Sequence, residues 1–256
     1  MNSVVGRRVF VGSAATGLPV VIMGARALAQ SIGAAGTAGG THVHPAGPVD
    51  PVYEHLFHAM AAVHNRMRRD VRGEDLRALA AQLRMLAVYG RRQDIDARIK
   101  ADLHHVIDRD GRHTLLTREP DLDALQTELD PYGLRLDNRW RTFFGASDLR
   151  RRSAVLDRTL MEGVTPRWER IAALLEQAAP QIDRRNGTIA RVALSRQDAE
   201  WYAGFCSQLQ TEMDDVKDVV ALFCGLYAVI SIYAKYQCIA ASLAYLSLLS
   251  IDIVNC

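Results

Sequence analysis

The chain has 256 residues, 49% of them hydrophobic and 23% charged, which is the composition of a globular protein with one or two domains. Residues 1–29 hold three arginines and no acidic residue, so the remaining chain carries 28 basic and 29 acidic side chains. This balance argues against the concentrated positive surface on which nucleic-acid binding depends, and we expect no nucleic-acid partner.

Residues 1–29 have the features of a cleavable export signal. Seventeen uncharged residues, diluted by glycine, serine, threonine and proline, separate Arg8 from Arg26. A membrane-spanning helix needs about twenty strongly apolar residues, so this segment is a poor membrane anchor. Ala27-Leu28-Ala29 supplies the small-x-small pattern that signal peptidase reads, and we expect cleavage after Ala29.

The order Arg7-Arg8-Val9-Phe10-Val11 resembles the twin-arginine (Tat) export signal, in which two arginines precede any residue, phenylalanine and leucine; Val11 replaces the leucine. The resemblance covers residues 1–29 alone. It implies that the Tat translocase and signal peptidase act on the chain. It also implies that the mature protein is periplasmic or secreted.

Residues 30–50 are rich in glycine, alanine and proline and lack apolar periodicity, so we expect a flexible linker there. A helical domain is predicted from residue 51 to 256. Asp50 before Pro51 is typical of a helix N-cap with proline in the first turn. The apolar residues that follow recur at intervals of three and four and predict one buried stripe: Val52, Leu56, Met60, Val63 and Met67.

Further helices are predicted over 73–90, ending at Gly90, and over 93–111, ending at Gly111. Similar patterns predict helices at 121–130, 147–162 and 166–178. One short extended piece is suggested by the sequence of residues 188–194. Amphipathic helices therefore account for residues 51–178, and the predicted fold class is all-α.

The four cysteines lie late in the chain, at Cys206, Cys224, Cys238 and Cys256. The first and last gaps are both 18 residues, which is five helical turns of about 3.6 residues. Each of these pairs therefore lies on one face of a helix. The four positions are also mirror-symmetric about Ser231, so a chain folded back there brings both helices into register.

Pairing within one helix fails, because a rise of 1.5 Å per residue separates those cysteines by roughly 27 Å. A disulfide needs about 5.5 Å between its Cα atoms. An antiparallel hairpin over 195–256 permits Cys206–Cys256 and Cys224–Cys238, and an oxidising compartment lets both bonds form. Two alternatives stay open: four buried thiols, and one continuous helix, since no glycine or proline marks a turn near Ser231.

Residues 219–251 contain one charged side chain, Lys235. Such a segment is either the buried centre of a bundle or a membrane-embedded hairpin. We favour a core hairpin wrapped by the helices of residues 51–178. Membrane contact through residues 219–251 is the second interpretation.

Five of the eight histidines lie between His42 and His64, and imidazole is a common metal ligand. His55 and His58 share a helix face, and His105 follows on a later helix, so these three are candidate metal ligands. His64 lies roughly 180° around the helix from His55. This spacing favours solvated or helix-flank histidines, and no cofactor is predicted.

The sequence contains none of the common zinc-protease, hydrolase, phosphate-binding or dinucleotide-binding motifs. The favoured hypothesis is an exported helical protein with a structural or binding role and no catalytic activity. One alternative is a Tat-exported protein that binds a metal or cofactor through the histidines from His42 to His64. The other is a protein anchored to a membrane by its C-terminal hairpin.

Overall fold

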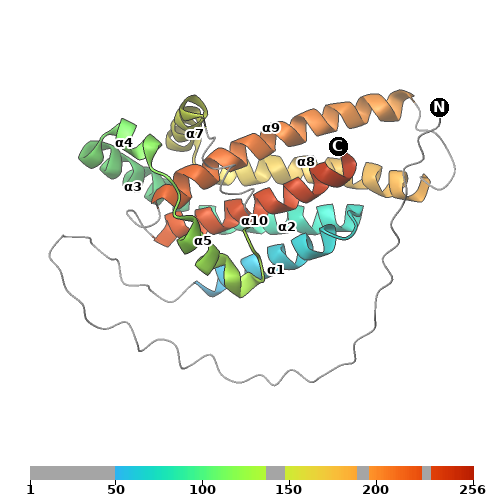
Figure 1. Ribbon diagram of the computed structural model, residues 1–256, viewed down its shortest axis with the longest axis horizontal. Coiled ribbons are helices and arrows are strands. Elements are labelled where there is room, and N and C mark those ends of the chain that lie inside the picture. The colour runs from blue at the N-terminus through green and yellow to red at the C-terminus, as the bar shows by residue number, and fades with distance from the viewer. Residues whose placement is uncertain (1–49, 137–147, 189–195, 227–231) are drawn as a thin grey trace, which may run out of the picture. The chain divides into compact units, whose positions relative to one another are not determined.

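A computed structural model describes residues 50–136, 148–188, 196–226 and 232–256 (Figure 1). Every regular element in these ranges is helical, which confirms the all-α prediction. The export signal, nearly all of the linker, His42, His44 and most of the suggested extended piece lie outside the described residues. The helices are α1 (Pro51–Met67), α2 (Gly73–Arg92), α3 (Ile95–Asp110), α4 (Arg112–Thr117), α5 (Leu122–Leu129), α7 (Leu149–Glu162), α8 (Thr165–Thr188), α9 (Arg196–Leu226) and α10 (Ile232–Asn255), with a 3-10 turn, η1 (Asp130–Tyr132), after α5.

Helix α1 begins as predicted, because a carboxylate oxygen of Asp50 accepts a hydrogen bond from the Val52 backbone N–H at 2.9 Å. Four of the five predicted stripe residues are buried, but Val52 is 38% exposed. Its neighbour Tyr53 faces the core in its place, because the Tyr53 ring stacks on Tyr236 of α10 at 4.3 Å between centroids. The prediction for Val52 was therefore wrong.

Two predicted helix ends, those of α2 and α8, lie earlier in the chain than the ends in the structure. Helix α2 continues past Gly90 to Arg92. Gly90 is needed for close packing, because a Cβ there would lie 2.6 Å from Cγ2 of Thr165. Helix α8 extends to Thr188 through Pro180, ten residues beyond the expected end, and its extension is docked where Asp183 accepts a hydrogen bond from the Gly73 N–H at 2.8 Å. The short helix α4 was not predicted.

Helices α2 and α8 form the most extensive helix pair in the described part of the chain. Their exposed edges carry a ladder of three ion pairs at seven-residue intervals, the spacing at which a helix returns to nearly the same face. The pairs run in opposite chain directions, so the two helices are antiparallel: Arg77–Asp183 (3.0 Å), Arg84–Glu176 (2.5 Å) and Arg91–Glu169.

The C-terminal hairpin has the predicted pairing. Helices α9 and α10 are separate helices, with residues 227–231, including Ser231, outside the described ranges. Disulfides join Cys206 to Cys256 and Cys224 to Cys238, with Cα–Cα distances of 5.7 and 4.9 Å. The structure therefore contradicts both the alternative of four free thiols and that of one continuous helix.

Helix α10 is the core helix of the bundle. It packs against α9 along its length and against α1, α3 and α5 on other sides (Figure 1). By length and composition alone it could cross a membrane, but 72% of its apolar window is buried inside the protein. This burial is what the core-hairpin interpretation predicts.

Candidate functional site

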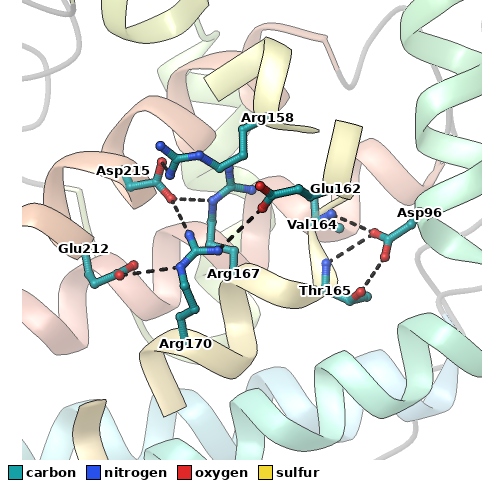
Figure 2. Close-up of polar contacts among 9 residues, drawn as sticks. All are labelled: Asp96, Arg158, Glu162, Val164, Thr165, Arg167, Arg170, Glu212 and Asp215. Atoms are coloured by element: carbon teal, nitrogen blue, oxygen red, sulfur yellow. Dashed lines mark hydrogen bonds and ion pairs between the residues drawn. The ribbon is translucent and has the colours of Figure 1, made fainter. Parts of the chain in front are cut away.

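A cluster of charged side chains surrounds Asp215 of α9, and we call it the Asp215 cluster (Figure 2). Three guanidinium groups approach this one carboxylate. Arg167 Nε lies 2.5 Å from Oδ2, Arg158 Nη1 lies 3.0 Å from Oδ1, and Arg170 Nη2 lies 3.5 Å from Oδ2. Glu162 and Glu212 complete the cluster, so three cations face three carboxylates.

The helical repeat explains why these residues meet. Arg167 and Arg170 are three residues apart on α8, and Glu212 and Asp215 are three residues apart on α9, so each pair lies on one helix face. Arg170 therefore reaches Glu212 as well as Asp215, with 3.7 Å between Nε and Oε1. The same guanidinium lies 3.9 Å from Glu162 of α7. The cluster thus joins three helices.

The start of α8 is fixed by a carboxylate from α3. Asp96 accepts hydrogen bonds from the backbone N–H groups of Val164 (2.7 Å) and Thr165 (3.2 Å), and from the Thr165 hydroxyl (Figure 2). Gly163 permits this approach, because its φ is +92° and a Cβ would lie 2.3 Å from Cγ of Asp96. Asp96 therefore sets the position of Arg167, which follows in the first turn.

Burial divides the cluster into an inner pair and an outer set. Arg167 is 1% exposed and Asp215 is 11% exposed, whereas Arg158 and Arg170 are about two-fifths exposed. Nη1 and Nη2 of Arg167 and Oε2 of Glu212 are buried without a hydrogen-bond partner among the described residues. Burial also raises the pKa of the Glu212 carboxyl above its ordinary value.

These features define what the cluster can do. A buried guanidinium is tolerated when a bonded carboxylate compensates its charge, and Asp215 provides that charge to Arg167. The surrounding arginines make this a poor place for a metal cation, despite its three carboxylates. The cluster therefore acts as an electrostatic clamp between α7, α8 and α9.

The predicted metal ligands are not gathered into a site. His55, His58 and His105 are all exposed. The His58 ring instead rests edge-on against Tyr132, with 4.8 Å between centroids. Within the described ranges, no three histidine, cysteine, aspartate or glutamate side chains come close enough to hold a metal ion.

His64 differs from the other candidates because it is buried in the core at 5% exposure. Its Nδ1 has no hydrogen-bond partner among the described residues. Burial lowers its pKa to about 4, so the ring is neutral at physiological pH. His64 is therefore a core residue of α1.

A second polar feature, a group of tyrosines around Asp50, was missed by the sequence analysis. Tyr89 of α2 donates a hydrogen bond to the Asp50 carboxylate, and the Asp50 N–H donates to the Tyr236 hydroxyl at 2.9 Å. The bond to Asp50 raises the pKa of Tyr89 to about 12. These contacts tie the beginning of the fold to α2 and α10. No sequence spacing signals them, because Asp50, Tyr89 and Tyr236 lie far apart in the sequence.

The Asp215 cluster was also missed. Part of the pattern is visible in the sequence, because Arg167 and Arg170 are three residues apart in one predicted helical region and Glu212 and Asp215 are three apart in another. No sequence pattern shows which helices pack against each other, so the contact between these two pairs could not be predicted.

Comparisons with protein-family models, with curated proteins and with solved structures found no match for this chain. Its function is therefore inferred from its own residues: the two disulfides, the charged clamp and the N-terminal segment.

Proposed function

We propose that the chain is an exported bacterial protein that acts outside the cytoplasm as a disulfide-stapled helical bundle with a structural or binding role. The observation that carries this proposal is the pair of disulfides that close both ends of the α9–α10 hairpin. Disulfides form and persist in oxidising compartments and are rare in the cytosol. The Tat-like residues Arg7, Arg8 and Phe10 supply a route to such a compartment.

The Asp215 cluster supports the structural part of the proposal. Its charged groups bond to one another across α7, α8 and α9, and the ladder between α2 and α8 does the same on another face. The Asp215 cluster therefore stabilises the packing of α7, α8 and α9, and the exposed ladder sets the register of α2 against α8. We propose that the chain acts in the periplasm, or in the medium after secretion.

The export test uses the full chain in a bacterial host with a Tat pathway. Replacing Arg7→Lys and Arg8→Lys should retain the chain in the cytoplasm at full length, because the twin arginines are the recognition element of this signal. A matched control replaces Arg68→Lys and Arg69→Lys, an adjacent arginine pair at the exposed end of α1. The control and the parent chain should both appear outside the cytoplasm, shortened by cleavage after Ala29.

Export of the twin-lysine variant at the parent level, or export in a host that lacks the Tat translocase, would contradict the Tat route. Full-length parent chain that stays in the cytoplasm would contradict export altogether. The two results are distinguished by the length of the recovered chain.

Membrane association is a second candidate, because α10 is long and apolar enough to span a bilayer. Its burial in the bundle opposes this reading. Fractionation of the mature chain tests it: we expect the chain in the aqueous phase after detergent partition. Recovery in the detergent phase would favour anchoring through residues 219–251.

A further inference from the structure

We propose that the Cys206–Cys256 disulfide is a thiol–disulfide exchange site for a dithiol, whereas Cys224–Cys238 is a permanent structural bond. This inference rests on the proposed function, because a disulfide can be exchanged only after it has formed. We call the two bonds the outer and the inner disulfide.

The two disulfides differ in accessibility. Cys224 and Cys238 are 2% and 1% exposed, so the inner disulfide is enclosed by the core. In the outer disulfide, Cys206 is partly exposed and Cys256 is exposed. Since the attacking thiolate must reach a sulfur atom, access determines which bond reacts.

The outer disulfide also lines a groove of about 530 Å³. Both α9 and α10 contribute polar residues to this groove, among them Ser207, Gln210 and Asp252. The groove is therefore open and polar, and its wall contains the sulfur–sulfur bond. It is suited to a hydrated thiol group and not to an apolar ligand.

The exchange proceeds in two displacement steps. A thiolate of the dithiol attacks Sγ of the more exposed Cys256, a mixed disulfide forms, and Cys206 leaves as a thiolate. The second thiolate of the dithiol then attacks the dithiol's first sulfur, which is bonded to Cys256 in the mixed disulfide. This step closes the dithiol's own disulfide and releases Cys256 as a thiolate. The outer disulfide gains two electrons, the dithiol becomes a disulfide, and its two protons pass to Cys206 and Cys256.

The fold is built to survive this reaction. The inner disulfide still joins α9 to α10, and α10 stays buried from Tyr236 through Leu248. The end of α10 also keeps a polar contact, since Arg185 Nη1 donates to the Asn255 carbonyl at 3.1 Å. Reduction therefore releases the covalent tie at this end of the hairpin without unfolding the bundle.

The test begins with the folded, oxidised chain, whose mass should be about 4 Da below that of the reduced chain because two disulfides have formed. Dithiothreitol is added without denaturant, the reaction is stopped with N-ethylmaleimide, and labelled peptides are mapped over time. We expect label on Cys206 and Cys256 at a rate more than about tenfold above that for the inner cysteines, because reaction there requires the core to open. Circular dichroism should keep its helical signal during the outer reaction.

Two double variants serve as matched controls. The variant with Cys224→Ser and Cys238→Ser should release two thiols at the parent rate. The variant with Cys206→Ser and Cys256→Ser should release none until urea is added. A parallel arm replaces dithiothreitol by a reduced Cys-x-x-Cys oxidoreductase at equal thiol concentration: reaction in both arms supports a protein dithiol, and reaction with dithiothreitol alone supports a small one.

The inference is overturned if all four cysteines become labelled together, if the inner pair reacts first, or if no thiol appears without denaturant. If the starting chain is not lighter than the reduced chain by about 4 Da, the two disulfides have not formed, and the proposed function is contradicted as well. A chain that has the lower mass and does not react overturns this inference alone.

Discussion

Replacing Asp215→Asn removes the carboxylate that neutralises Arg167 while leaving the size of the side chain almost unchanged. Arg167 is 1% exposed, so its guanidinium would be left buried without a bonded counter-charge. Breaking a buried ion pair by removing one partner costs about 3–5 kcal/mol. Arg158 and Arg170 add little to this cost, because both are partly exposed and water solvates their charge when the carboxylate is lost.

The free energy of unfolding is measured by urea titration followed by circular dichroism, without reductant so that both disulfides persist. With a urea dependence of about 2 kcal/mol per molar, the loss lowers the midpoint by about 2 M. The control is Asp157→Asn, which breaks a 2.7 Å pair with Arg112 whose side chains are 49% and 42% exposed. Such exposed pairs contribute at most about 1 kcal/mol.

A second variant tests the reason for the loss. Adding Arg167→Met to Asp215→Asn removes the buried cation together with its partner, and should recover more than half of the lost stability, because apolar replacements of buried ion pairs are often neutral. An Asp215→Asn variant no less stable than Asp157→Asn would refute the clamp. So would a double variant that is less stable than the single one.

Three further predictions concern stability. Gly90→Ala should lower the unfolding free energy by about 1–3 kcal/mol through overpacking against Thr165, whereas Gly204→Ala, with open space around the new Cβ, should raise it by about 0.5–1 kcal/mol; equal thermal shifts would contradict the close-packing argument. Burial of His64 means that the folded chain binds fewer protons than the unfolded chain, so about 3 kcal/mol should be lost as pH falls from 6.5 towards the folded pKa of about 4. His64→Leu should flatten this slope in urea titrations, and an unchanged slope would reject the assignment. Arg84→Ala should cost less than about 1 kcal/mol, with the difference disappearing in high salt; a larger, salt-independent loss would show that the ladder does more than mark register.

The disulfide hairpin was predictable because it follows from one geometric fact. An 18-residue gap is five helical turns, so a chain that turns back near Ser231 can pair its cysteines in only one way, and the export signal favoured the oxidised state. The existence of most helices was equally accessible from apolar periodicity. The N-cap at Asp50 needed only the local chemistry of an aspartate before a proline.

Contacts between helices were not predictable in the same way. The arginines at positions 77, 84 and 91 show a seven-residue spacing, yet nothing in the sequence of α2 names α8 as the partner. Gly90 resembles a helix end in sequence, and only the approach of Thr165 shows that it serves packing. The Asp215 cluster depends on three helices meeting, which no local pattern encodes.

Export from the cytoplasm and the pairing of the four cysteines can be tested together on one sample. The most direct measurement is a non-reducing peptide map, with N-terminal analysis, of the chain recovered from an exporting bacterial host. We expect a chain that begins at Gln30, with Cys206 linked to Cys256 and Cys224 linked to Cys238. A Cys206–Cys224 link, or four free thiols in the exported chain, would contradict it.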